Sequence, residues 1–244
     1  MPTTNGPNIA LRGNGMNPLI AEHTKELALR VRAFIDDVVV PMEHTLDSRA
    51  HGIGADVRAD LQSAARLHGV FAPTASREFG GLGLSHLAQA IVLEESGRSL
   101  LGPTAMNCAA PDEGNILLLD KVASPAQRVK YLEPLATGAV RSSFAMTEPA
   151  PGAGADPDSL LTTARATGDG FVITGNKWFT TGADGAAFSI VMARTGGAAT
   201  MFLVDADNPG MQIVRQLDTL DTTFSGGHAE VNRSEEHTSE LQSH

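Results

Sequence analysis

Apolar residues recur at helical spacing through the first half of the chain. A first helix is predicted to end at Pro41, because proline has no N–H and obstructs the helical hydrogen-bond ladder. A second is expected to stop near Gly69, and a third to begin at an N-cap, Ser85, and run to about Ser99. The apolar faces of these three helices comprise Leu27, Val31, Phe34, Ile35 and Val38, then Val57, Leu61, Ala64, Ala65 and Leu67, then Leu87, Ile91 and Val92.

Two further helices complete this half. A short one is predicted over residues 115–122. The run from Ser124 to Gln127 then has serine at the N-cap, proline at the first helical position and glutamine at the third, which is the pattern of a capping box. We expect this fifth helix to run to about Thr137 and to stop at Gly138.

After Gly138 the apolar period changes from 3.6 to 2, which indicates strands. Gly168 and Gly170 separate two alternating runs, the signature of a hairpin. Many short strands in succession favour a barrel or a sandwich. The sequence therefore predicts an α+β fold with an all-α helical domain over 20–140 and a β domain over 141–232, after a flexible lead over 1–19. The expected strands are 142–147, 161–167, 171–174, 188–194, 200–205, 211–217 and 227–231.

Composition narrows the class of protein. The 244 residues are 42% hydrophobic, and the net charge of −10 argues against nucleic acid or an anionic membrane as a main partner. No apolar run approaches the roughly 18 residues of a membrane span. The single cysteine, Cys108, excludes an intrachain disulfide, and without a signal segment this favours a cytoplasmic location. A catalytic thiol is conceivable, but we favour a small packing residue.

Two glycine-containing loops are candidates for ligand binding. The loop that contains Gly80, Gly81 and Gly83 has no following Lys-Ser or Lys-Thr, so we favour a connector over a phosphate loop. The second loop follows a strand that ends in Met146 and Thr147, and its glycines would let phosphates approach the backbone. From the residues alone, a ligand site and an ordinary turn both remain open at the second loop.

The motifs taken together resemble the acyl-CoA dehydrogenase family. They are Phe-Ala-Met-Thr-Glu-Pro over 144–149, Lys-Trp-Phe-Thr-Thr-Gly over 177–182, Glu-Phe-Gly-Gly-Leu-Gly over 78–83 and Leu-Asp-Thr-Leu over 217–220. The resemblance covers about residues 20–232. It implies FAD as cofactor, a β-barrel for the middle domain, and a C-terminal helical domain that this chain does not reach. It also implies acyl-CoA as substrate, an electron-transferring flavoprotein as partner and a homo-oligomeric full-length enzyme.

Residue by residue, the resemblance implies a flavin cradle. An isoalloxazine ring needs donors near N1, C2 and N5, where charge and hydride collect on reduction. The positions that match Met146 and Thr147 would supply donors at one side of the ring, the first through its backbone N–H. The position that matches Thr180 would offer a hydroxyl near N5. A core tryptophan and ordinary strand threonines are the structural alternatives.

Aromatic residues and one loop position complete this cradle. The resemblance places Trp178 along one face of the ring, with Phe144 and Phe179 as neighbours. Ala155 stands where the family commonly has a serine that bonds the flavin pyrophosphate or the acyl-CoA, so only its backbone N–H could donate. Two residues, Ala150 and Pro151, are inserted before it relative to the usual loop, and Thr181 replaces a common asparagine.

The catalytic base of the family is a glutamate in the C-terminal domain, so we expect no catalytic residue in this chain. Glu148 is the tempting substitute, but we favour a structural or loop-capping carboxylate. Residues 233–244 leave the family pattern and resemble the translation of a sequencing-adapter oligonucleotide, so we expect this segment to be non-native. A metal cluster of Glu236, His237 and Glu240 is the disfavoured alternative, and no metal site is expected.

These observations predict a fragment of an FAD-dependent acyl-CoA dehydrogenase that forms trans-2-enoyl-CoA. The rival hypotheses are a same-fold acyl-CoA oxidase or flavin monooxygenase, and a non-catalytic flavin or acyl-CoA binding module.

Overall fold

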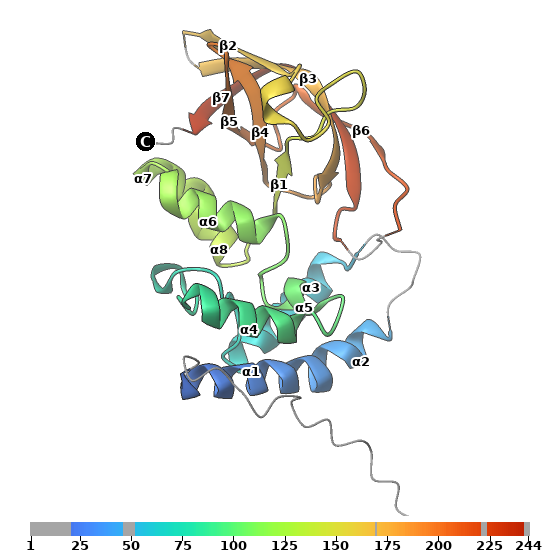
Figure 1. The fold of residues 1–244 in the computed structure, drawn as a ribbon. Coiled ribbons are helices and arrows are strands. Elements are labelled where there is room, and N and C mark those ends of the chain that lie inside the picture. Colours follow the sequence, from blue (N-terminus) through green and yellow to red (C-terminus); the bar gives the residue numbers. More distant parts are fainter. Residues whose placement is uncertain (1–20, 46–51, 169, 221–223, 242–244) are drawn as a thin grey trace, which may run out of the picture.

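A computed structural model describes residues 21–45, 52–168, 170–220 and 224–241, with the side chains of the last strand described through Asn232. The predicted lead over 1–19 lies outside the described residues. Helices occupy the first half and strands the second, so the predicted fold class is confirmed. Figure 1 shows the helices grouped below the sheet, with β1 descending to meet them.

Within the described residues, the helical half comprises eight α-helical segments and three short π- or 3-10-helical segments, and a fourth short segment, η4, lies between β1 and β2. Their bounds are α1 Glu22–Phe34, η1 Ile35–Val39, α2 Val40–Glu43, α3 Ala55–Leu67, η2 Arg77–Phe79, α4 His86–Ser96, α5 Gly102–Ala105, α6 Asp112–Val122, α7 Pro125–Gln127, η3 Arg128–Leu132, α8 Glu133–Ala136 and η4 Pro157–Ser159.

The predicted caps are present. The Ser85 hydroxyl accepts the Ala88 N–H at 3.4 Å, and Ser124 forms the reciprocal capping box with Gln127. Gly69 and Gly138 have φ values of 65° and 70°, so each supplies the left-handed conformation in which a helix commonly ends. The third helix stops at Ser96 rather than near Ser99.

The prediction that Pro41 ends the first helix is wrong. The helix continues through a π-helical turn, in which the Val40 N–H bonds the Ile35 carbonyl, and ends only at Glu43. Pro41 is at the start of the last short turn. The wider π turn interrupts the regular α-helical ladder just before the proline, so the missing N–H disrupts no regular helical bond.

The strands form a mixed seven-stranded sheet in the order β1-β4-β2-β3-β7-β5, with β6 beside β7. Parallel β1 and β4 lie next to each other, and β5 pairs with both β4 and β7. The sheet does not close into a regular barrel, because β2 reaches β4 through one residue pair, Thr163 with Arg194. The strands are β1 Ser142–Ala145, β2 Thr163–Thr167, β3 Gly170–Thr181, β4 Phe188–Thr195, β5 Ala198–Asp205, β6 Met211–Gln216 and β7 His228–Leu241.

The seventh strand continues into the segment predicted to be non-native, and Thr238 pairs with Phe171 of β3. The domain limits and the non-native origin of residues 233–244 stay predictions.

The largest hydrophobic cluster spans the helices and one face of the sheet, and two smaller clusters lie within the strand half. The largest cluster joins residues of α1, α3 and α6 to Phe188, Ile190 and Leu203 of the sheet. The rings of Tyr131 and Phe188 meet across the junction with centroids 4.8 Å apart. Polar contacts reinforce it, since the buried Asn115 amide donates to the Ser142 hydroxyl at 2.9 Å. The helical half thus supports the strand from which the candidate site begins.

Candidate functional site

The candidate site begins where β1 ends. The chain leaves the strand at Ala145 and turns into a loop that folds back on itself, because the Glu148 N–H bonds the Gly154 carbonyl at 3.0 Å. Within the loop the Gly152 N–H bonds the Pro149 carbonyl at 2.7 Å. Gly154 has φ 58°, and a Cβ there would meet nothing within 4 Å. The loop that the sequence singled out is therefore a closed turn with one open glycine.

The two predicted motifs lie side by side. The Trp178 N–H of β3 donates to the Thr147 carbonyl at 3.0 Å, which joins the end of β1 to the middle of β3. Residues 178 and 179 form a β-bulge, because Lys177 pairs with Val231 and Thr180 with Ala229. Phe179 has φ 49° and stays 48% exposed, and its ring centroid lies 5.0 Å from that of Trp178. Bulges commonly re-aim side chains at functional sites.

The adjacent threonines face different surroundings. Thr180 is fully buried, and its hydroxyl has no hydrogen-bond partner in the described part of the chain. Thr181 lines a cavity at the junction of the two domains, and its hydroxyl lies 2.9 Å from His228 Nδ1. An orphaned buried hydroxyl next in sequence to the exposed Phe179 is compatible with a bound ligand that completes its hydrogen bonding.

Other predicted site residues are more dispersed. Phe144 is half-buried and packs against the helical core cluster, so its ring belongs to the domain junction. Met146 and Thr147 are half-buried at the strand end. Ala155 is exposed on the loop. Its neighbour Asp156 accepts the Asp158 N–H at 3.0 Å and so caps the short helix that follows.

A buried ion pair that the sequence did not reveal lies under the site. Lys177 Nζ is 3.0 Å from Glu148 Oε1 and 2.8 Å from the Met146 carbonyl. Glu148 also accepts the N–H groups of Leu161 and Thr162, each at 2.8 Å. Burial alone would raise the pKa of Glu148, but these donors and the Lys177 ammonium lower it to about 2. Glu148 is therefore an ionised, fully engaged carboxylate and is unsuited to act as a base.

The sequence contained one indication of this ion pair, which is a lysine within the predicted β domain. The Lys177 side chain is 0% exposed, and a lysine is almost never fully buried unless it is paired. The alternation of buried and exposed positions in β3 could have marked Lys177 as inward-facing, but its partner could not be read from spacing.

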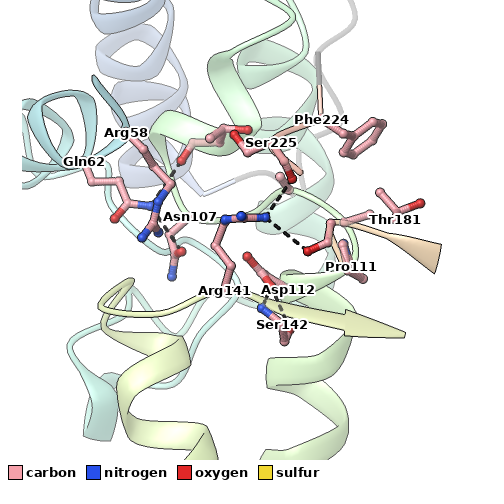
Figure 2. Close-up of a pocket in the computed structure, with 14 residues that line it drawn as sticks. Arg58, Gln62, Asn107, Pro111, Asp112, Arg141, Ser142, Thr181, Phe224 and Ser225 are labelled. Atoms are coloured by element: carbon pink, nitrogen blue, oxygen red, sulfur yellow. Dashed lines mark hydrogen bonds between the residues drawn. The ribbon is translucent and has the colours of Figure 1, made fainter. Parts of the chain in front are cut away.

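The cavity at the domain junction is small and polar. Its volume of about 30 Å³ has room for one or two water molecules. Figure 2 shows the Arg141 guanidinium reaching between the segments, where it donates to the Ser225 carbonyl at 2.7 Å. Arg141 also donates to the Asp184 carbonyl at 2.7 Å. Asp112 accepts both the N–H and the hydroxyl of Ser142 at 2.7 Å, and burial raises its pKa. These hydrogen bonds connect the start of β1 to helix α6 and to the loops that contain Asp184 and Ser225.

Cys108 is buried, and burial raises the pKa of its thiol to about 12. This environment suits a packing residue rather than a nucleophile. Among residues whose side chains are described, no group of three or more His, Cys, Asp or Glu could hold a metal. Glu236, His237 and Glu240 lie outside that set. Within the described ranges no helix is long and apolar enough to cross a membrane.

Comparison with family models decides the family. The model of the acyl-CoA dehydrogenase N-terminal domain matches residues 21–139, and that of the middle domain matches 143–230. The chain belongs to the acyl-CoA dehydrogenase family. The matches cover both halves of this family member and leave out only its two ends and the short link between the halves.

Individual relatives agree. Human acyl-CoA dehydrogenase family member 11 is 30% identical over 230 residues, which cover 85% of this chain and 29% of that protein. A structure from Mycobacterium abscessus, assigned as an acyl-CoA dehydrogenase, is 32% identical with a TM-score of 0.79 and covers 88% of this chain and 58% of its own. An acyl-CoA dehydrogenase from Bacillus anthracis, complexed with FAD, shares the fold at 24% identity and a TM-score of 0.73, over 92% of this chain and 38% of its own. The chain thus spans less than two thirds of each.

Proposed function

We propose that this chain supplies the flavin-binding half of an acyl-CoA dehydrogenase, the part that holds the oxidant for conversion of acyl-CoA to trans-2-enoyl-CoA. One observation carries the proposal: the Trp178–Thr147 backbone hydrogen bond brings the two predicted motifs into one surface. Family membership and the FAD in the Bacillus anthracis relative support FAD as the cofactor. When bound, FAD would accept the hydride equivalent that leaves the acyl chain.

The residues present fit a flavin. Met146 and Thr147 would offer backbone N–H donors at the strand end. Trp178 and the exposed Phe179 would cover the ring, and a threonine hydroxyl would face N5. Among the described residues, the Thr180 hydroxyl is one of several buried polar atoms without a hydrogen-bond partner, and Phe179 is an exposed aromatic side chain next to it in β3.

Either of two threonines could supply this hydroxyl. The resemblance implies Thr180, and the neighbouring Thr181 is the alternative, although its hydroxyl lies beside His228 and it lines the domain-junction cavity. Successive residues of a strand point to opposite faces, so only one of the two can face the ring.

The phosphates would lie along the loop after β1. Gly154 leaves its backbone open, and the exposed Ala155 would donate only its N–H. Ala155 replaces the serine that is common in the family, so we expect this loop to bind the pyrophosphate or acyl-CoA more weakly than a loop with that serine.

The base for α-proton removal is expected outside these 244 residues, because Glu148 is engaged and ionised with a pKa of about 2. We propose that the full-length enzyme is a homo-oligomer that passes electrons to an electron-transferring flavoprotein. The isolated chain is expected to bind FAD weakly and to turn over little acyl-CoA.

Titration of the purified chain with FAD, followed by quenching of flavin fluorescence, tests the binding proposal. We expect saturable quenching without steady reduction of an artificial electron acceptor by acyl-CoA. Absence of any flavin binding at high protein concentration would contradict the assignment of the surface, and steady turnover would contradict the assignment of the base.

A further inference from the structure

The buried Glu148–Lys177 pair joins the two motifs of the proposed flavin site. Glu148 lies in the first motif, directly after Thr147, and Lys177 begins the second, directly before Trp178. Their side chains are 2% and 0% exposed. An ion pair buried this deeply costs desolvation that apolar side chains of the same volume would avoid, so fold stability alone does not explain its presence.

Lys177 acts on one particular peptide group. Its ammonium donates to the Met146 carbonyl at 2.8 Å. That carbonyl belongs to the same planar peptide as the Thr147 N–H, and the two groups of a trans peptide point in opposite directions. Fixing the carbonyl toward Lys177 therefore fixes the Thr147 N–H on the opposite side. A cation on the carbonyl also polarises the peptide and strengthens its N–H as a donor.

Glu148 holds the lysine and the loop together. One carboxylate oxygen accepts from Lys177 and from the Thr162 N–H, and the other accepts the Leu161 N–H. The loop between them also passes close to Glu148, since a Cβ at Gly152 would lie 2.7 Å from the Glu148 Cβ. The carboxylate thus ties the start of the loop to its end at Thr162.

We propose that Lys177, held by Glu148, is a positioning residue that aims the Thr147 backbone N–H at the bound flavin ring. This inference rests on the proposed function, because the ring is its target. Neither residue touches reacting atoms. Their effect passes through the Met146–Thr147 peptide, whose next peptide is fixed in turn by the Trp178 N–H.

Substitution of Lys177 by methionine removes the ammonium and keeps an unbranched buried chain. Lys177→Met is expected to weaken binding of both riboflavin and FAD by about tenfold, because the charge-assisted hydrogen bond that orients the Met146–Thr147 peptide is lost. The factor should be equal for the two ligands, because both share the ring. Lys130→Met, at an exposed lysine that pairs with Asp205, is the matched control and should change neither affinity.

A second variant guards against misfolding. Glu148→Gln combined with Lys177→Met leaves no unpaired buried charge, and it should show the same loss of riboflavin affinity if the cation orients the peptide. An unchanged riboflavin affinity in a folded variant, or a loss seen only with FAD, would overturn the proposal.

A measurement on the chain without flavin tests the orientation of the Met146–Thr147 peptide separately from the proposed flavin binding. In the ligand-free chain, Lys177→Met should shift the Thr147 amide resonance, while amides of α3 and α4 keep theirs. An unmoved Thr147 amide counts against the positioning role even where flavin binds. A wild-type chain that binds no flavin, but whose Thr147 amide shifts, supports the peptide orientation and contradicts the flavin assignment.

Discussion

At the residue scale, the chemistry of this chain is concentrated in a few buried polar side chains. Glu148 has every carboxylate oxygen engaged and lies under the proposed site, whereas Thr180 has a hydroxyl with no partner among the described residues. The first arrangement is complete without a ligand, and the second is incomplete. This contrast separates the supporting residues from those that would contact a cofactor.

The ionised state of Glu148 gives stability a pH dependence. Because its pKa is lowered from 4.5 to about 2, its contribution is fully present above pH 4.5 and is lost as pH falls toward 2. We expect the free energy of unfolding to lose about 2 kcal/mol from this group between pH 6 and pH 3. Urea unfolding of the wild type and Glu148→Gln at both pH values measures the difference. Equal losses in the two proteins would contradict the assignment.

Cys108 is expected to be inert in the folded chain. A thiol pKa raised from 9.0 to about 12 lowers the thiolate fraction about a thousandfold, and burial adds a steric barrier. Native protein should react with a disulfide reagent only as fast as it unfolds, with full reaction in denaturant. Rapid labelling of the native chain would instead indicate an accessible thiol.

The two threonines give a paired test of the flavin surface. Valine preserves the shape of threonine but has no hydroxyl, so Thr180→Val and Thr181→Val each remove one candidate donor. The variant that removes the N5-facing hydroxyl should weaken riboflavin binding by about three- to tenfold, and the other should not. Fluorescence titration of both variants measures this. If both leave the affinity unchanged, neither hydroxyl faces the ring.

At the element scale, two irregularities shape the molecule. The π turn at η1 lets the first helix pass Pro41, and the bulge at Trp178 and Phe179 changes the register of a twelve-residue strand at the proposed flavin surface. Each adds one residue to a regular hydrogen-bond pattern, and the spacing of apolar residues in the sequence does not reveal such an insertion.

Among the described glycines, Gly102 leaves the least room for a side chain. A Cβ there would overlap the Ser96 carbonyl at the end of α4 and lie 2.9 Å from Ile35 Cδ1. Gly102→Ala should therefore destabilise the chain by about 1–3 kcal/mol, because helix α5 must move away. Gly114→Ala is the matched control in α6, where nothing lies within 4 Å, and it should be neutral or stabilising by about 0.5–1 kcal/mol. Equal thermal shifts in the two variants would contradict this contact.

At the scale of the whole molecule, the helices and the sheet share the largest hydrophobic cluster. Phe188, Ile190 and Leu203 of the sheet belong to the same cluster as α1 and α6. Asn115 adds a hydrogen bond across the junction, to the Ser142 hydroxyl.

This shared core predicts cooperative unfolding of the two halves. Trp178 is the single tryptophan and reports on the sheet, while far-ultraviolet circular dichroism at 222 nm reports mainly on the helices. Both signals should give the same urea midpoint, because the largest hydrophobic cluster draws its residues from both halves. Asn115→Ala should lower the urea midpoint of both signals together, because it reduces the free energy of unfolding by about 1–3 kcal/mol. Separate midpoints in the wild type would show independent domains.

The sequence by itself determined the features that depend only on residues close together in the chain. The Ser124 capping box, the stops at Gly69 and Gly138 and the change of period after Gly138 follow from local sterics and hydrogen bonding, and all are present in the structure. Family motifs added FAD as the expected cofactor and the two segments of the candidate site.

Only the tertiary structure decided how those segments meet. The Trp178–Thr147 bond, the Glu148–Lys177 pair and the Thr181–His228 contact join residues about 30 to 50 positions apart. Their partners depend on strand order and register, and a shift of one residue would turn every side chain of a strand to the opposite face. The bulge makes such a shift within β3, so the folded sheet, and not the spacing in the sequence, decides which threonine would face the proposed ligand.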